Sequence, residues 1–233
     1  MLAVSVTLLV GLISGLLVGW LVGYLKLDSM IVTLGMLSVL QALTLIYTNG
    51  QFQTLIDKST WYAFIGGGYV SIIPFPVILY AMIVVIFWII LNKMVFGKQL
   101  QAVGYNRVAS QFSGIKDKKV VLSTFVLTGV LSAVAGILIS SRVLGSQNTM
   151  GQGYEFSVIT AVILGGASIT GGYGSIYKTT IGALLIGFLN NGFIMVGVPY
   201  YYQYLAQWFI IVGVVWADLA AKERAKESGV ELR

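Results

Sequence analysis

The chain alternates between long apolar runs and short polar breaks. An α-helix needs about 20 mostly apolar residues to cross the hydrocarbon core of a bilayer. The runs predict an all-α, polytopic helical membrane protein with about seven membrane segments, near residues 2–25, 30–47, 77–95, 120–141, 154–169, 176–196 and 203–217. The stretch 48–73 is too polar and too broken to span, and the fifth segment is short.

A glycine recurs at every fourth position of the first run. Residues at this spacing lie on one helical face, and small residues there let a second helix approach closely. We therefore expect close helix packing at Gly11, Gly15, Gly19 and Gly23. The fourth run has a comparable small face, made by Gly129, Ala133 and Gly136.

The longest polar break, residues 93–119, contains several basic residues and a single acid, Asp117. A break this basic belongs on the cytoplasmic face, because basic loops resist translocation. Asn106 as N-cap and Gly114 as helix stop predict a short amphipathic helix, whose apolar positions are Val103, Val108, Phe112 and Ile115. Such a helix suits a soluble partner, and a solvated loop that only sets topology is the alternative.

Composition removes several kinds of chemistry. Of the 233 residues, 58% are hydrophobic and 9% are charged, whereas soluble domains have about 25% charged residues. The absence of Cys excludes disulfides, thiolate metal sites and Cys nucleophiles, and the absence of His removes the commonest general base and metal ligand. The net charge of +6 comes from bases scattered between spans, so we expect neither a metal site nor nucleic-acid binding.

The basic residues also predict the orientation. With the 93–119 loop inside, every Lys and Arg except Lys58 and Arg142 is cytoplasmic, including those of the C-terminal tail. Met1 is then outside, at the head of an outward-to-inward span and without a signal sequence. An odd number of upstream spans would explain this arrangement.

Four sequence blocks, spread over nearly the whole chain, carry a family resemblance. The first reads Ala102-x-Gly104-x-Asn106-x-x-Ala109-Ser110-x-x-Ser113-Gly114-Ile115, and the others lie within 15–35, 64–76 and 151–192. Together they resemble the permease subunits of monosaccharide ABC importers of the ribose, xylose, galactose and autoinducer-2 type. The first block is similar to the cytoplasmic coupling loop of that family.

The resemblance implies a single transmembrane permease domain over 1–219, with a cytoplasmic coupling loop at 97–119 and a cytoplasmic tail at 220–233. The chain would form half of a channel for a monosaccharide or similar small polyol in the bacterial cytoplasmic (inner) membrane. It would not be an enzyme and would hold no cofactor, because a separate cytoplasmic ABC ATPase would bind ATP and Mg. Its other partners would be a second permease copy or homologue, an extracytoplasmic sugar-binding protein and membrane lipid. The residues expected to couple to the ATPase are Ala102, Gly104, Asn106, Ala109, Ser113, Gly114 and Ile115.

The chain departs from the family in three places. Arg107 stands where Pro is frequent, Tyr173 where a basic residue is common, and Lys178 where Gly is common. Members usually have about ten spans, and this chain begins at what resembles the fourth. Three preceding spans would restore an inside N-terminus.

A neutral sugar needs hydrogen-bonding groups along its path. Candidates within or near the spans are Asn190, Asn191, Gln41, Thr160 and Glu155. The amides and Thr160 could equally bond between helices, which is the commoner use of such residues, and Glu155 could instead cap the fifth helix. The glycine cluster at 165–174 lacks the Lys and Ser or Thr of a phosphate-binding loop, so we interpret it as a tight turn between two short helices.

Several other functions stay open at this point. An ATP-independent transporter would need intramembrane charges for ion coupling, which this chain almost lacks. A branched-chain amino-acid ABC permease has a related architecture with a different coupling loop. An intramembrane enzyme would have almost no catalytic groups, and a truncated, inactive remnant would share the ancestry without the activity.

Overall fold

A computed structural model of the chain describes residues 2–55, 60–168 and 171–199, together with 201–203, 205–206, 208–210, 212–213 and 215–216. The helices with defined bounds are α1 (Leu2–Gly23), α2 (Ser29–Thr48), α3 (Thr60–Gly67), α4 (Phe75–Lys93), α5 (Val95–Tyr105), α6 (Arg107–Phe112), α7 (Asp117–Val143), α8 (Tyr154–Leu164) and α9 (Ile176–Met195). Two-residue strands form two antiparallel pairs, β1 (Gln53–Thr54) with β4 (Gly145–Ser146) and β2 (Tyr69–Val70) with β3 (Ile73–Pro74). The predicted helical, polytopic class is confirmed.

Four helices, α1, α2, α4 and α7, are long and apolar enough to cross a membrane. The 20-residue α9 coincides with the sixth predicted segment, and the 11-residue α8 with the short fifth. The seventh predicted segment, 203–217, lies partly outside the described residues, and the tail 220–233 lies wholly outside them. The number of seven segments therefore stays a prediction.

Several predicted boundaries were wrong by a few residues. Helix α1 ends at Gly23 and not at residue 25, and α4 begins and ends two residues earlier than predicted. Helix α7 begins at Asp117 and continues to Val143, because its polar first turn and Arg142 in its last turn are tolerated at the helix ends. Helix α8 ends at Leu164, where Gly165 and Gly166 begin the turn, and Gly166 has a φ of 74°. The turn at 165–174 therefore joins one short helix to one full-length helix.

Helices α1 and α7 pack antiparallel along the glycine row of α1. A Cβ added to Gly15 would lie 2.6 Å from the carbonyl oxygen of Phe125, and one added to Gly19 would lie 3.0 Å from that of Leu122. All four glycines of the row are buried. Because glycine has no side chain, the two backbones approach to a distance that no other residue permits.

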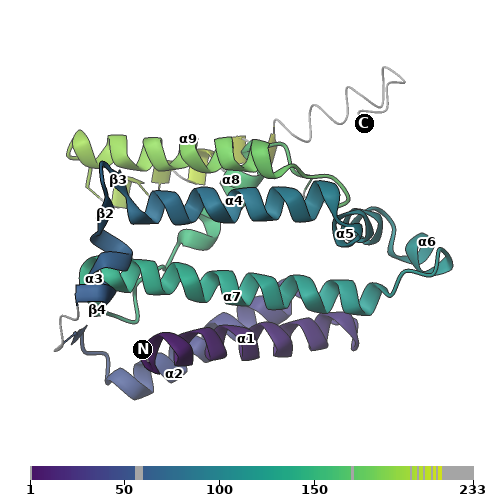
Figure 1. The fold of residues 1–233 in the computed structure, drawn as a ribbon, viewed down its shortest axis with the longest axis horizontal. Coiled ribbons are helices and arrows are strands. Elements are labelled where there is room, and N and C mark those ends of the chain that lie inside the picture. Colours follow the sequence, from purple (N-terminus) through teal and green to yellow (C-terminus); the bar gives the residue numbers. More distant parts are fainter. Residues whose placement is uncertain are drawn as a thin grey trace.

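The long helices form two groups (Figure 1). One group contains α1, α2 and α7, and the other contains α4, α8 and α9. Helices α8 and α9 also meet through glycine, since a Cβ on Gly165 would lie 2.7 Å from the Lys178 carbonyl oxygen. At one end of the molecule α3 packs on both α4 and α7, and at the other end α5 does the same.

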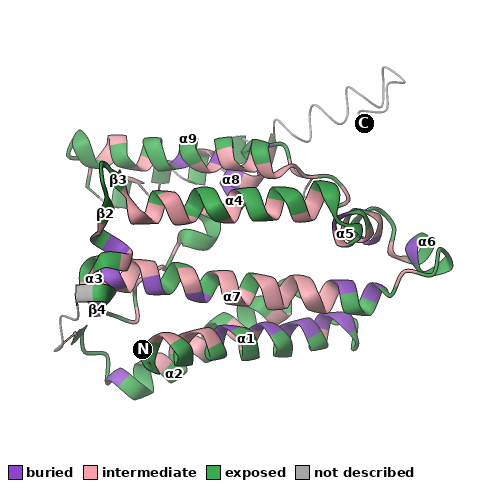
Figure 2. Cartoon of the chain, viewed as in Figure 1, coloured by how far each residue is buried: buried purple, intermediate pink, exposed green. Residues whose placement is uncertain are grey.

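Most residues of the long helices are exposed or half-buried (Figure 2), and many of the exposed ones are large and apolar. Helix α4 has no buried residue, and the buried positions of α1 lie along its contact with α7. This distribution suits a lipid environment, where apolar surface need not be buried and helices associate through close packing instead.

Candidate functional site

The polar break folds into two helices with a sharp junction at Asn106. The Asn106 backbone is extended (φ −153°, ψ 106°), which ends α5 and starts α6. Its side-chain oxygen accepts a hydrogen bond from the Ala109 amide at 3.0 Å, as an N-cap does. Beyond α6, Gly114 has a φ of 79°, a conformation that favours glycine. The structure therefore contains the short helix, with helical residues 107–112 inside the predicted 106–115.

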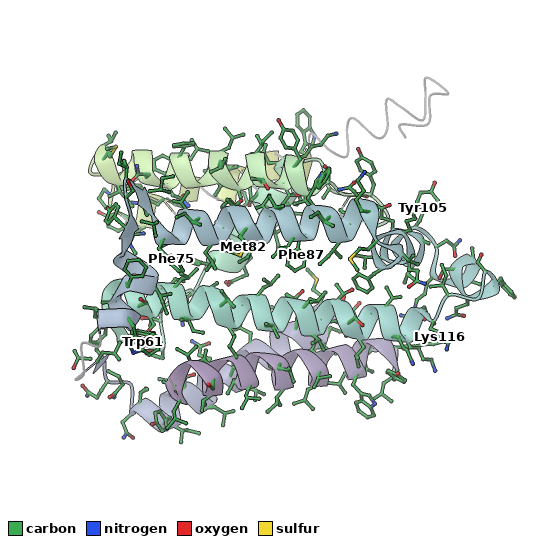
Figure 3. The ribbon with its side chains drawn as sticks, in the orientation of Figure 1. Trp61, Phe75, Met82, Phe87, Tyr105 and Lys116 are labelled. Atoms are coloured by element: carbon green, nitrogen blue, oxygen red, sulfur yellow. The ribbon has the colours of Figure 1, made fainter. Side chains whose placement is uncertain are left out.

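The two faces of α6 differ strongly. Ser110 is buried on one face, and its hydroxyl donates to the Arg107 carbonyl oxygen at 2.8 Å. On the other face the side chains of Val108 and Phe112 are 61% and 90% exposed. They are four residues apart and so lie side by side on the helix surface. Helix α6 lies beyond the ends of the long helices (Figure 1), and Tyr105 and Lys116 lie at the same end (Figure 3).

Arg107 joins the start of α6 to the ends of two long helices. Its Nε donates to Asp117 Oδ2 at 2.7 Å, and its Nη2 donates to the Gly23 carbonyl oxygen at 3.1 Å. Asp117 is the first residue of α7, and Gly23 is the last residue of α1. A carboxylate at a helix N-terminus and a cation at a helix C-terminus both complement the helix dipoles.

Asp117 is only 5% exposed, but its carboxylate is hydrogen-bonded to protein groups. Helix α7 is about 40 Å long, which exceeds the hydrocarbon core of about 30 Å, so its charged first turn projects beyond the apolar core. Burial opposes ionisation of Asp117. Hydrogen bonds from the Arg107 and Gln111 side chains and from the Lys118 amide outweigh burial and, with the Arg107 charge, hold the pKa of Asp117 below its ordinary value.

The glycine loop after α8 lies against the junction of α5 and α6. A Cβ on Gly104 would lie 2.8 Å from the Gly172 amide nitrogen, and one on Gly171 would lie 2.8 Å from the Gly104 carbonyl oxygen. Gly171 and Gly172 both have positive φ, 90° and 83°. The loop that we predicted as a tight turn thus brings the α8–α9 pair to the same place as the start of α6.

A cavity of about 480 Å³ lies at this junction. Five of the predicted coupling residues line it, namely Ala102, Asn106, Ala109, Ser113 and Ile115. Gly104 forms the adjoining backbone contact, and Gly114 follows the end of α6. The structure therefore brings the predicted coupling residues together around one feature. Its lining has polar groups and a lysine, Lys98, but the arrangement offers contact surface rather than reactive groups.

The predicted substrate-path residues are not gathered into one site. Gln41 lies on α2, which packs on α1, whereas Asn190 and Asn191 lie on α9. Asn190 and Gln41 are half-buried, and the exposed Asn191 amide contacts the Met195 sulfur at 3.9 Å.

The two candidates on α8 have local explanations. Thr160 is 0% exposed, and its hydroxyl donates to the Phe156 carbonyl oxygen at 2.6 Å. Glu155 is exposed in the first turn of α8, but the cap position is occupied by Gly153. Capping by Glu155 was therefore wrong, although its charge still complements the helix N-terminus.

No group of acidic residues suited to a metal ion occurs within the described part of the chain. The residues that sequence reasoning missed are Arg107, Asp117 and Gln111. In the sequence, Arg107 stands out only as a departure from a family pattern. The available signal was Asp117 itself, the one acid in a basic stretch, which calls for a cationic partner nearby.

Comparisons with known proteins agree with this architecture. The family described as "Branched-chain amino acid transport system / permease component" matches residues 1–215. The ribose import permease protein of Haemophilus influenzae is 38% identical over 219 residues, which are 93% of this chain and 68% of that protein. The Bacillus subtilis ribose import permease protein is 40% identical over 193 residues, which are 83% of this chain and 60% of that protein.

The L-arabinose transport system permease protein of Escherichia coli is 32% identical over 206 residues, which are 88% of this chain and 61% of that protein. The chain thus spans 60–68% of the length of these three relatives. No solved structure gives a significant match.

Proposed function

This chain belongs to the family of branched-chain amino acid transport system permease components, and from that membership we propose that it forms half of an ABC importer channel. It has no nucleotide-binding Lys motif of its own. A separate cytoplasmic ATPase, which binds ATP and Mg, supplies the energy. The chain is a transporter subunit and not an enzyme.

The proposed substrate is a monosaccharide or similar small polyol. The relatives reported above are named for ribose and L-arabinose, which favours a sugar over the branched-chain amino acids in the family's description. Asn190, Asn191 and Gln41 are the polar groups that we propose along the path, since a neutral polyol is recognised by hydrogen bonds. Thr160 and Glu155 support this role less, because the first is fully buried and the second lies at a helix end.

The observation that carries the proposal is the exposed apolar face of α6. Val108 and Phe112 project from a helix that stands beyond the membrane-length helices, beside the exposed Tyr105. Exposed apolar clusters rimmed by polar residues mark protein-interaction sites. The rim here is basic, with Lys98, Lys116 and Lys119 all exposed. We propose that this face docks in a groove of the ATPase and that Ala102, Gly104, Asn106, Ala109, Ser113, Gly114 and Ile115 shape it.

The remaining partners follow from the same proposal. A second permease copy or homologue completes the channel, and the exposed apolar faces of α2 and α4 are available to it and to membrane lipid. An extracytoplasmic sugar-binding protein delivers substrate at the end that holds α3 and the strands. The protein lies in the bacterial cytoplasmic membrane with the C-terminus and α6 inside, and it does not bind nucleic acid.

The test uses two substitutions at equally exposed residues. Phe112 is 90% exposed on α6, and Ile72 is 89% exposed at the opposite end, between β2 and β3. We expect a tagged wild-type chain to retain the ATPase through gentle solubilisation and to support uptake of labelled ribose or arabinose in the native host. Phe112→Asp should lose the ATPase, while Ile72→Asp should retain it.

Retention of the ATPase by the Phe112→Asp variant would contradict docking through α6. Uptake of leucine in place of either sugar would favour the amino-acid alternative. A wild-type chain that retains no ATPase would identify an inactive remnant or an ATP-independent transporter.

A further inference from the structure

Three helix ends meet at Arg107, and together they link the exposed helix α6 to the α1–α7 pair. Arg107 is the first residue of α6, Asp117 the first residue of α7, and Gly23 the last residue of α1. Gln111 lies one turn after Arg107, and its side chain favours the ionised form of the Asp117 carboxylate. Two residues on one face of α6 therefore stabilise one buried carboxylate, and Arg107 bonds to it directly.

We infer that Arg107 and Asp117 are positioning residues that make α6 move as one body with α1 and α7. This inference rests on the proposed docking of α6 to an ATPase. It identifies the contacts through which a displacement of α6 would be transmitted to the membrane-length helices α1 and α7. The guanidinium has a planar set of donors, so it bonds two acceptors at once in a fixed geometry. Bonds to Asp117 and to the Gly23 carbonyl oxygen therefore restrict rotation of α6 as well as its distance from both helices.

The contact of this junction with the α8–α9 pair is of a different kind. There, the Gly104 backbone lies against Gly171 and Gly172, and the Tyr105 side chain also lies close to Gly172. Within the described residues, the Arg107–Asp117 pair is the salt bridge that holds α6, and none joins it to α8 or α9. A displacement along this contact breaks no ionic bond, whereas moving α6 away from α1 and α7 would break the bonds of Arg107 to Asp117 and to the Gly23 carbonyl oxygen.

The two contacts together predict which parts move relative to each other. When the ATPase displaces α6, α1 and α7 follow, since their glycine seam and the Arg107 bonds form a continuous rigid path. The α8–α9 pair then shifts against the junction at Gly172. Such rigid-body displacement is a common way in which a small movement at one site changes a distant one.

The experiment measures two distances in the assembled transporter, with the ATPase bound. The chain has no cysteine, so introduced cysteines are its only sites for spin labels. One pair, Val108→Cys with Tyr24→Cys, reports α6 against the end of α1. The other, Val108→Cys with Tyr177→Cys, reports α6 against α9, and all three positions are exposed. Because Val108 lies on the proposed docking face, only labelled chains that retain the ATPase through solubilisation and still import sugar are measured. We expect ATP to change the second distance and leave the first unchanged.

Breaking the salt bridge should decouple α6 from α1. In Asp117→Asn, the distance between labels at 108 and 24 should broaden and become ATP-sensitive. The ATP hydrolysed per sugar imported should rise on the order of fivefold, the lower end of usual coupling effects. Loss of folded protein alone would lower hydrolysis and import together and leave that ratio unchanged.

Two further variants serve as controls. Arg107→Lys keeps the charge but lacks the planar fork, so it should give an intermediate ratio. Lys93→Gln, in the last turn of α4, removes an exposed charge outside both the docking face and the salt bridge and should behave as wild type. An ATP-dependent change between positions 108 and 24 in the wild type would overturn the inference, as would a wild-type ratio in Asp117→Asn. If the wild-type chain binds no ATPase, the proposed function fails first, and the inference falls with it.

Discussion

Gly11 and Gly129 face each other where α1 crosses α7, and each occupies the space that a side chain on the other would need. A Cβ on Gly11 would lie 2.5 Å from the Gly129 carbonyl oxygen, and a Cβ on Gly129 would lie 3.1 Å from the Gly15 Cα. The close approaches extend from Gly11 to Gly23, so the seam follows more than half of the length of α1. The stability of this helix pair therefore depends on backbone proximity.

Replacement of Gly129 by Val should separate α1 from α7. We expect a loss of about 1–3 kcal/mol in the free energy of unfolding, the usual cost of overpacking, and a lower thermal midpoint in detergent. Gly136 lies on the same helix with no atom within 4 Å of an added Cβ, so Gly136→Val is the matched control. Equal midpoints for the two variants would show that the seam does not limit stability.

Gly104 and Gly114 should respond differently to the size of a substitution. A side chain on Gly104 meets the Gly172 backbone, so we expect Gly104→Trp to abolish sugar uptake and Gly104→Ala to reduce it less. Gly114 has open space but a φ of 79°, so Ala and Trp there should cause similar losses through backbone strain. Uptake assays with immunoblots of the membrane fraction separate lost transport from lost insertion. Normal uptake by Gly104→Trp would contradict a role for this contact.

Ser141 should stabilise the end of the molecule opposite to α6. It is 2% exposed, accepts a hydrogen bond from the Gly66 amide at 2.8 Å, and donates to the Tyr62 carbonyl oxygen. Ser141→Ala removes both of these hydrogen bonds to α3, at a cost of about 1–3 kcal/mol.

The matched control for Ser141 is Ser123→Ala on the same helix, because the Ser123 hydroxyl bonds only to a carbonyl one turn earlier. Thermal unfolding followed by tryptophan fluorescence measures both variants, since Trp61 lies on α3. A Ser141 variant as stable as the Ser123 variant would count against this bridge.

The predicted orientation can be measured with single cysteines in the cysteine-free chain. A membrane-impermeant maleimide should label Ile72→Cys in intact cells and should label Phe112→Cys only after permeabilisation. Both side chains are almost fully exposed, so accessibility in the protein itself is equal. The reverse labelling pattern would invert the orientation and exclude docking of a cytoplasmic ATPase on α6.

The features that could be predicted from the sequence are local ones. The cap at Asn106, the stop at Gly114 and the glycine row of α1 each depend on residues within a turn or two of one another. Periodicity and capping chemistry are therefore sufficient to find them. Even there, the glycine row predicted a packing face on α1 but did not identify α7 as the helix that packs on it. Gly136 also lies off the face formed by Gly129 and Ala133.

The long-range part of the site could not be predicted in this way. Arg107 and Gly23 are separated by 84 positions, and the backbone carbonyl that Arg107 binds has no sequence signature. The contact of Gly104 with Gly172 likewise depends on how the α8–α9 pair is placed. Polar residues within the predicted membrane segments gave an ambiguous signal. The Thr160 hydroxyl bonds within its own helix, and Gln41 and Asn190 lie on separate helices.

The glycine seam also has a consequence for how the sequence can evolve. Each residue advances an α-helix by about 100°, so one inserted residue between Gly15 and Gly19 would turn the earlier half of the row away from α7. Outward-facing positions such as Leu17 can exchange one apolar residue for another at little cost. In related sequences, the outward-facing apolar positions of this stretch should therefore vary, whereas insertions and deletions within it should be absent.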